Sequence, residues 1–421
     1  MARGHAYPAD LARFVAEHWP HPAAPLRLTP KLLDEALSAA YQASLTTEET
    51  RPTRFRLLLT PVEELPEAGV PNEGVLRLTF DHDRPLHEDE LRRLAPAAPF
   101  ETSLIGAQAD AAEKLRIWGI AHSGPTWLAP TWGGRSLVPN WTYDPIVHVT
   151  APGKIAVRSA GKLIGAIERG LLVDATIDVF ESDWLPQMFA EAREQIRAEH
   201  DALQVRSTVP TSVENSLIGR VSQHMVRRAI QLVRGARHGG MLLVVSGSGP
   251  GAPIPAGLRL KYRITQDEPS HRYRSIQLQI FETLAAGTTN PTVGWSDFES
   301  SAHPRLEKLE QEVFELSRAI ANLTAIDGAV VLDKRFGLLG FGAEVSAELP
   351  APARVLRALD GEGRNRIPEE VEKFGTRHRA AYRFVGDHRD GLAIVISQDG
   401  GVSFVAQKDG EVTIWEQSVS P

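Results

Sequence analysis

Hydrophobic residues recur along this chain with two periods, one typical of helices and one typical of strands. Apolar positions three and four residues apart predict helices at 32–43, 184–203, 216–233 and 304–323. Continuous or alternating apolar runs predict strands at 55–59, 75–80, 146–150, 154–159, 171–180, 241–245, 258–264, 330–332, 336–341, 391–397, 402–407 and 411–415. The last three runs are joined by glycine-bearing turns, as in antiparallel hairpins. The pattern predicts a mixed α/β (α+β) protein.

The order of the elements divides the chain into three regions. The polar stretch 204–214, which contains Pro210, is the best candidate for a domain boundary. The division gives an N-terminal α+β region at 1–115, a second region with a linking helix at 116–210, and a C-terminal domain at 211–421. In the second region, Trp118, Trp127 and Trp132 lie among glycines and prolines. Buried aromatic residues are common, so the interpretation as packing anchors is favoured over a ligand platform.

Composition narrows the class of protein. The 421 residues are 42% hydrophobic and 24% charged, and 46 basic against 53 acidic residues give a formal net charge of −7. A mildly acidic chain is a poor candidate for coating DNA or an anionic membrane, because affinity for polyphosphates comes from basic residues. The chain contains no cysteine, which excludes disulfides, thiolate metal sites and cysteine nucleophiles. It also lacks a long apolar membrane span, so a cytoplasmic location without a membrane is expected.

The first candidate for chemistry lies where the predicted helix 304–323 meets the strand 330–332. Asp327, Gly328 and Ala329 join the two elements. A carboxylate at such a junction is exposed at the end of the sheet, where it can bind a sugar hydroxyl or a hard divalent cation. Gly328 would let a ligand approach the backbone closely. Because Asp-Gly is also a common turn dipeptide, this motif gains weight only with a second one.

The second candidate is the segment 375–381, which begins with Gly375, Thr376, Arg377, His378 and Arg379. Thr376 is a good N-cap, so a helix is predicted to begin there. Cations in the first turn of a helix are unfavourable, because the helix dipole is already positive at this end. A bound anion, above all a polyphosphate, would remove the conflict. The segment therefore predicts a phosphate-binding site in preference to a solvated basic turn.

Taken together, the two motifs resemble the signature motifs of the bacterial diadenylate cyclase domain, which makes cyclic di-AMP from ATP. The resemblance extends to the helix-to-strand step at 237–245 and to Ser397, which follows the apolar strand 391–397. It covers about the C-terminal half, 211–421. The long N-terminal half is similar to the sensor regions of a soluble subgroup of this family, so 116–210 is expected to be a sensor or regulatory region with an unknown ligand or partner.

The resemblance implies a central mixed, largely antiparallel sheet flanked by helices, with one ATP on each copy of the domain. Two domains would face each other in at least a transient homo-oligomer, and each ribose 3'-hydroxyl would attack the α-phosphate of the other ATP. Asp327 would bind Mg²⁺ or Mn²⁺ and help to activate the hydroxyl. Thr376, Arg377, His378 and Arg379 would hold the phosphates. The remaining implied contacts to ATP are Gly328, Ala329, Gly375 and Ser397.

Two departures from the family leave alternatives open. Many members have Glu after the serine, whereas this chain has Gln398 and then Asp399. The connection between the motifs is also long, and Pro350, Pro352 and the charged stretch 360–366 predict an inserted surface loop. One alternative is a catalytically silent receptor for ATP or cyclic di-AMP.

The other alternative places metal-dependent hydrolysis in the N-terminal half. Its candidate ligands would be His18, His21, His82 and His87. These residues lack the helical i, i+4 spacing of zinc motifs, which favours scattered surface histidines.

Overall fold

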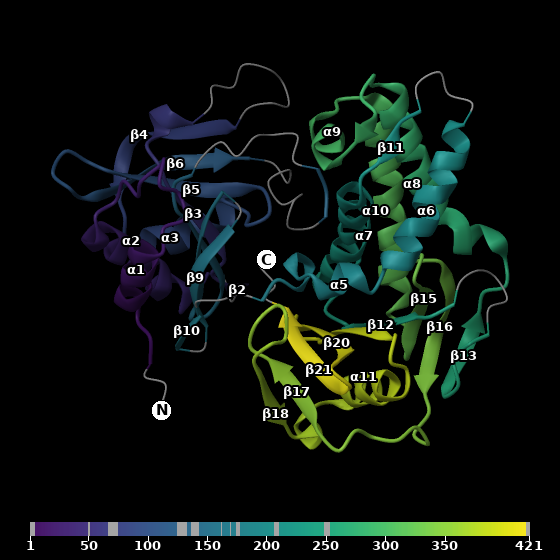
Figure 1. Ribbon diagram of the computed structural model, residues 1–421. Coiled ribbons are helices and arrows are strands. Elements are labelled where there is room, and N and C mark those ends of the chain that lie inside the picture. Colours follow the sequence, from purple (N-terminus) through teal and green to yellow (C-terminus); the bar gives the residue numbers. More distant parts are fainter. Residues whose placement is uncertain are drawn as a thin grey trace. The chain divides into compact units, whose positions relative to one another are not determined.

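The computed structural model describes residues 5–48, 51–65, 75–123, 133–135, 143–160, 162–168, 170–173, 177–205, 210–247 and 253–417. The chain forms two compact units (Figure 1). The N-terminal unit covers 1–130 and 136–176, and the C-terminal unit covers 131–135 and 177–420. The main boundary thus lies at 176–177, upstream of the polar stretch 204–214. The three-region division by sequence stays a prediction.

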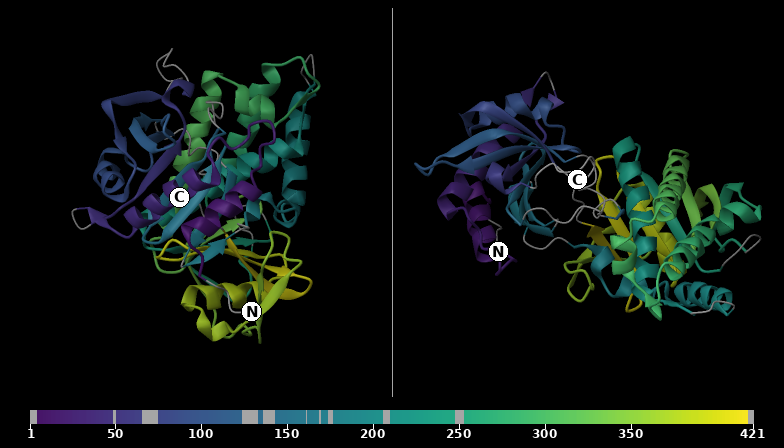
Figure 2. Two further views of the ribbon diagram at one scale, coloured as in Figure 1. Left: turned by 90° about the vertical axis from the view of Figure 1, so that its left-hand side faces the viewer. Right: turned by 90° about the horizontal axis from the view of Figure 1, so that it is seen from above.

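The N-terminal unit is built on an eight-stranded sheet of order β10-β9-β8-β7-β3-β5-β6-β4. Its strands are β3 (Phe55–Leu59), β4 (Leu76–Pro85), β5 (Ser103–Ala109), β6 (Leu115–His122), β7 (Ile146–Ala151), β8 (Lys154–Ser159), β9 (Lys162–Glu168) and β10 (Leu171–Val173). Only β3 and β5 run parallel. Helices α1 (Pro8–Glu17) and α2 (Pro30–Ser44) pack with the sheet over one apolar core, and Figure 2 shows these purple helices stacked on the blue strands.

A smaller apolar cluster lies around Trp118 in the same unit. The indole nitrogen of Trp118 donates a hydrogen bond to the carbonyl of Thr60 at 2.9 Å, and the ring lies directly on Gly106. The interpretation of Trp118 as a packing anchor is confirmed. Trp127 and Trp132 lie outside the described residues.

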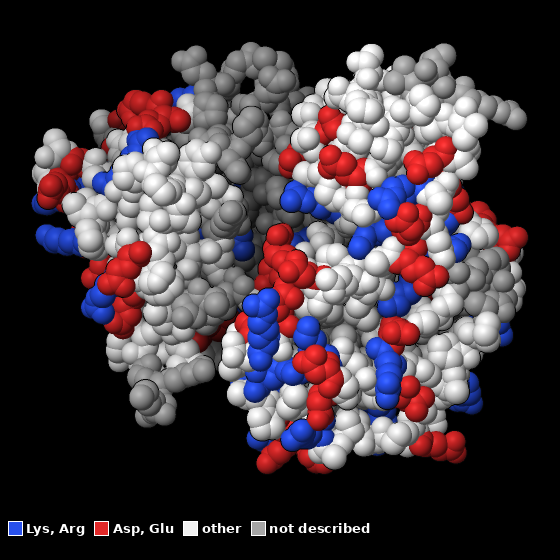
Figure 3. All heavy atoms as spheres, in the orientation of Figure 1, with Lys and Arg blue, Asp and Glu red and all other residues white. Residues whose placement is uncertain are grey.

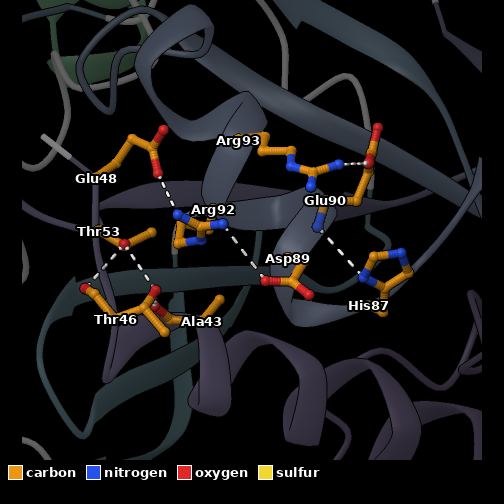
Figure 4. Close-up of polar contacts among 9 residues, drawn as sticks. All are labelled: Ala43, Thr46, Glu48, Thr53, His87, Asp89, Glu90, Arg92 and Arg93. Atoms are coloured by element: carbon orange, nitrogen blue, oxygen red, sulfur yellow. Dashed lines mark hydrogen bonds and ion pairs between the residues drawn. The ribbon is translucent and has the colours of Figure 1, made fainter.

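Helix α3 (Glu88–Leu94) is tied by polar contacts to the short hairpin β1 (Thr47–Glu48) and β2 (Arg51–Pro52), as Figure 4 shows. Arg92 donates to Glu48 at 2.7 Å and also contacts Asp89 at 3.5 Å. The ring of His87 caps the helix, because its Nδ1 accepts a hydrogen bond from the amide of Glu90 at 3.3 Å. A capping role accounts for His87 without a metal.

The C-terminal unit contains a nine-stranded sheet of order β13-β16-β15-β12-β19-β20-β21-β17-β18. These strands are β12 (Gly240–Val245), β13 (Leu258–Arg263), β15 (Ala329–Asp333), β16 (Leu338–Val345), β17 (Val355–Ala358), β18 (Arg366–Glu369), β19 (Leu392–Ile396), β20 (Val402–Lys408) and β21 (Glu411–Gln417). Neighbours are antiparallel except for β12 with β15 and β17 with β21. The expected mixed, largely antiparallel sheet is confirmed.

Alternate residues of the central strands face two separate cores. Leu242, Val244 and their neighbours on one face pack against helices α7 (Asn215–Ala236), α8 (Asp267–Ala286) and α10 (Pro304–Leu323). Met241, Leu243 and Val245 point to the other face, which is covered by α11 (Thr376–Asp387). The period of two in the sequence thus produces a sheet buried between helices on both sides.

Helices at the start of this unit and small elements at its rim complete it. They are η4 (Val179–Glu181), α5 (Trp184–Gln187), α6 (Ala190–Gln204), β11 (Ser212–Val213), β14 (Thr292–Val293) and α9 (Trp295–Ser300). The indole of Trp184 stacks on Trp415 at 4.3 Å and donates to the carbonyl of Gly361 at 2.9 Å. This segment is therefore part of the core of the C-terminal unit.

Three predicted elements differ in the structure. The strand predicted at 171–180 ends at Val173 and is followed by η4, because Asp178 accepts a hydrogen bond from the amide of Phe180 and turns the chain. The single helix predicted at 184–203 is two helices, α5 and α6, with a break at Met188 and Phe189. The predicted surface loop at 350–366 contains β17 and leads into β18, and together they form a hairpin on the sheet.

Candidate active site

Asp327 lies at the junction that the sequence predicts. After α10 ends at Leu323, tight turn bonds from the amides of Thr324, Ala325 and Ile326 continue the chain to Asp327, and β15 begins two residues later. The Asp327 side chain is exposed, and it makes no hydrogen bond or ion pair within the described part of the chain. A carboxylate held in this way is open to a ligand at the end of the sheet.

The two residues after Asp327 have packing roles. Gly328 has φ +116°, and a Cβ there would lie 2.6 Å from the carbonyl carbon of Gly342 on β16. The close approach that requires glycine is therefore to a neighbouring strand. Ala329 is 1% exposed and belongs to the core under α11. Contact of either residue with a nucleotide stays a prediction.

Helix α11 begins one residue before the predicted position. Its N-cap is Gly375, whose backbone is extended, and Thr376 is the first helical residue, so the prediction of Thr376 as the N-cap is wrong. The amide of Arg379 already bonds to the carbonyl of Gly375 at 3.1 Å, which sets this register. No acidic residue lies in the first turn and no side chain caps it. The positive end of α11 is thus not neutralised within the helix.

Arg377 connects α11 to the loop before β12. Its guanidinium donates to the carbonyl of His238 at 3.3 Å. It also lies so close to Gly239, which has φ +66°, that a Cβ on that residue would be 2.8 Å from Nη1. Gly239 therefore makes room for the arginine at the end of the sheet.

His378 and Arg379 point to different surroundings. Nε2 of His378 lies 3.2 Å from Oγ of Ser403 on β20, and the ring contacts Phe374. Burial lowers the pKa of His378, and attraction to Asp399 opposes the shift. The lowered pKa favours the neutral form of His378, whose ring lies against the sheet. Arg379 is exposed, and its side chain makes no hydrogen bond or ion pair within the described residues. Phosphate binding by both residues stays a prediction.

Ser397 is fixed in the tight turn between β19 and β20. Its hydroxyl donates to Oδ1 of Asp399, and its amide donates to the carbonyl of Gly401 at 2.8 Å. Arg234 of α7 donates to the carbonyl of Gly400 at 2.9 Å and holds the turn from outside. Arg234 has no distinctive signal in the sequence, because its partner is a backbone carbonyl far along the chain.

Strand register brings these segments to one end of the sheet. Leu242 of β12 pairs with Val330 of β15, so Gly239 and Asp327 are equally far back along the two parallel strands. Gly240 pairs with Ile396 of β19, which places Ser397 beside the same strand end. We call this place, where β12 and β15 begin and β19 ends, the motif end of the sheet. It carries Asp327, Ser397 and, through Arg377, the start of α11.

Asp327 is a candidate ligand for a magnesium or manganese ion at the motif end of the sheet. No group of three or more His, Asp or Glu side chains arranged to hold a metal occurs in the described ranges. Mg²⁺ commonly uses one or two carboxylates together with substrate phosphates and water. The exposed Asp327 could supply such a carboxylate beside a nucleotide.

The histidines of the N-terminal unit have separate surroundings. Nδ1 of His18 lies 2.9 Å from the carbonyl of Phe14, the ring of His21 packs on Tyr143, and His82 is next to Asp81. Within the described residues, they do not form the metal cluster of the hydrolase alternative.

Charge on the visible surface is mixed. Figure 3 shows lysine and arginine interspersed with aspartate and glutamate on the face of the C-terminal unit that it displays. No helix in the described part of the chain combines the length and the apolar character that a membrane span requires.

Comparison with known proteins identifies one part of the chain. Residues 24–122 match the model of a family described as the probable sensor domain DACNV. They run from just before α2 to the end of β6 and therefore lie in the N-terminal unit. The match supports a sensor domain in the N-terminal half. It lies mainly in the region 1–115, for which the sequence predicts no role, and it includes only 116–122 of the region 116–210, where a sensor was expected. No curated protein and no solved structure matches the chain.

Proposed function

We propose that the C-terminal unit is a metal-dependent diadenylate cyclase domain and that the N-terminal unit regulates it. The observation that carries the proposal is the meeting of Asp327, Ser397 and the start of α11 at the motif end of the sheet. These segments lie far apart in the sequence, and each is part of the resemblance to this family. The sensor domain at 24–122 supports the regulatory part, because this domain is associated with diadenylate cyclases.

The residues at the motif end suit phosphoryl transfer, which depends on positioning and on neutralisation of charge. The free amides of α11, Arg377 and Arg379 would bind the phosphates of ATP. Asp327 would hold Mg²⁺ or Mn²⁺, which neutralises phosphate charge when it is bound, and would orient the ribose hydroxyl. The contact of His378 with Ser403 would hold α11 against the sheet.

In the reaction, two copies of the domain face each other with one ATP each. A ribose 3'-oxygen forms a bond to the α-phosphorus of the opposite ATP, and the bond between the α- and β-phosphates breaks. Pyrophosphate leaves, and the hydroxyl proton passes to the solvent. The same step in the other direction closes the ring, so two ATP give cyclic di-AMP and two pyrophosphates.

The test is incubation of the full-length protein with ATP and Mg²⁺ or Mn²⁺, followed by mass spectrometry for cyclic di-AMP. Asp327→Asn should abolish the product, because it removes the charge at the metal position. Glu348→Gln is the matched control, since it neutralises another exposed carboxylate of the unit and should leave activity unchanged. Both variants should unfold at the temperature of the unmodified protein.

Full activity of Asp327→Asn would overturn the assigned role. ATP binding without any product, in full-length protein and in the isolated C-terminal unit, would instead favour the receptor. The engagement of the Ser397 hydroxyl by Asp399 is the observation that keeps this second function in view.

A further inference from the structure

A hollow lies in the C-terminal unit, away from the motif end of the sheet. It lies between α5, α6, α7, α8 and the sheet, and it is partly open to solvent. The walls are largely apolar and include Phe189, Ile196, Val226, Phe336, Ile394 and Phe404. A partly open pocket with apolar walls and a few polar groups is typical of sites for small organic molecules.

Strand register separates this hollow from the candidate active site. Val244 and Leu392, which line it, pair with each other across β12 and β19. The pair at the motif end of the same two strands is Gly240 and Ile396. The hollow is thus at the opposite end of β12, and it lies on the helix face that α11 does not cover.

Four cationic residues line the hollow, and the side chains of three of them make hydrogen bonds only to neutral groups within the described residues. Nζ of Lys334 donates to the carbonyl of Met188 at 3.1 Å and lies 5.2 Å from the ring centre of Phe189. Arg335 donates to the side-chain oxygen of Gln195 at 2.8 Å, and Arg193 donates to the carbonyl of Pro186.

Burial lowers the pKa of Lys334 and of Arg193. At Lys334, attraction to Asp390 opposes this shift of the pKa. At Arg193, burial is the one cause of the shift. Arg274, which also lines the hollow, is different because it forms an ion pair with Glu199. Lys334, Arg335 and Arg193 therefore line the apolar hollow without an ion pair to a carboxylate among the described residues.

We propose that this hollow binds an amphipathic anion, a molecule with an apolar body and one carboxylate or phosphate head. The apolar body would cover the walls, and the head would neutralise Lys334, Arg335 and Arg193. Burying a charge is costly unless it is paired, so the head removes a cost that the unliganded site carries. A neutral molecule with the same apolar body would leave the three cations unpaired, and the cost of burying them would remain.

A substitution in α7 can fill the hollow. Gly219 lines the hollow, and a Cβ built on it meets no atom within 4 Å. Leucine is a better helix former than glycine, so Gly219→Leu should fold and project its side chain into the hollow. Gly235 lies in the same helix, also has open space around it and does not line the hollow, so Gly235→Leu is the matched control.

Binding is measured on the full-length protein by titration calorimetry with decanoate, decyl phosphate and the neutral decanol. We expect at least one anion to bind tenfold or more tightly than decanol, and the tighter anion identifies the head group. Gly219→Leu should weaken that anion at least tenfold, while Gly235→Leu should bind it as the unmodified protein does. Lys334→Gln keeps most of the side-chain length and should reduce the preference for the anion over decanol.

Equal binding of decanol and both anions would overturn the proposal, as would unchanged binding by Gly219→Leu. ATP binding is measured in parallel and should not change in Gly219→Leu, because the hollow is at the opposite end of β12. None of these readouts depends on cyclase activity.

Discussion

Gly239 offers a sharp test of how the motif end of the sheet is built. It has φ +66°, a conformation that residues with a side chain rarely adopt. A Cβ there would lie 2.8 Å from both Nη1 of Arg377 and the carbonyl oxygen of Ile396. The change Gly239→Ala therefore strains the backbone and presses on two groups of the site at once.

The expected cost follows from these contacts. The left-handed conformation alone costs about 1–2 kcal/mol for a residue other than glycine. The Arg377 guanidinium can move away, but the Ile396 carbonyl belongs to a buried strand and cannot. For a domain of this size, each kcal/mol lowers the melting temperature by about 2–4 °C, so Gly239→Ala should melt about 2–8 °C lower.

Gly235→Ala is the control, because it is the same substitution four residues earlier in the chain. Gly235 is helical, and an added Cβ meets no atom within 4 Å. Replacing a helical glycine with alanine is worth about 0.4–1 kcal/mol, so this variant should melt at an equal or slightly higher temperature. Of the two changes, only Gly239→Ala is thus predicted to lower the melting temperature.

The assay is thermal unfolding, with ATP titration at a temperature well below both transitions. Because Arg377 must move in Gly239→Ala, ATP affinity should fall in this variant and not in Gly235→Ala. A Gly239→Ala protein that melts with the unmodified protein, or above it, would refute the argument from its backbone and its neighbours.

Two further outcomes concern stability. Burial lowers the pKa of His224 to about 3, so only the unfolded chain takes up its proton between pH 6.5 and that value, and stability falls with acid. Between pH 7 and pH 5, protonation of this group in the unfolded chain lowers the free energy of unfolding by about 2 kcal/mol. Urea unfolding at the two pH values should therefore show a smaller loss of stability in His224→Gln than in the unmodified protein. Equal losses in the two proteins would contradict this. A fragment 177–421 retains Phe180 and Trp184 in its core and should unfold cooperatively, whereas 211–421 lacks them and should melt lower or aggregate. Size-exclusion chromatography and melting curves that do not distinguish the two fragments would count against the boundary at 176–177.

The sequence predicts the regular elements well where one period dominates. Strands 55–59 and 154–159 and helix 304–323 have the predicted bounds. Prediction fails where a polar side chain decides the local path, as at Asp178, which caps a short turn and pairs with Arg227 on α7. The hairpin of β17 and β18 was missed for a related reason, since its partner β21 lies far along the chain.

The candidate site was predictable only in part. The exposure of Asp327 and the cationic start of α11 follow from local order in the sequence. The contacts of Arg377 with His238, of His378 with Ser403 and of Arg234 with Gly400 join distant segments. Short-range patterns contain no information on such pairs. The inward orientation of the His378 ring therefore could not be predicted, because its partner Ser403 lies on a distant strand.

The two outermost strands of the nine-stranded sheet restrict how copies of this protein can associate. β18 contains Pro368, which has no amide hydrogen to donate to an added strand. At the other margin, β13 carries Arg259, Lys261 and Arg263, and charged side chains on an outer strand discourage pairing with another chain. Both margins are thus protected against growth into a continuous intermolecular sheet. Any pairing that brings two motif ends together would have to rely on complementary side-chain surfaces, which can form and separate without disturbing the fold.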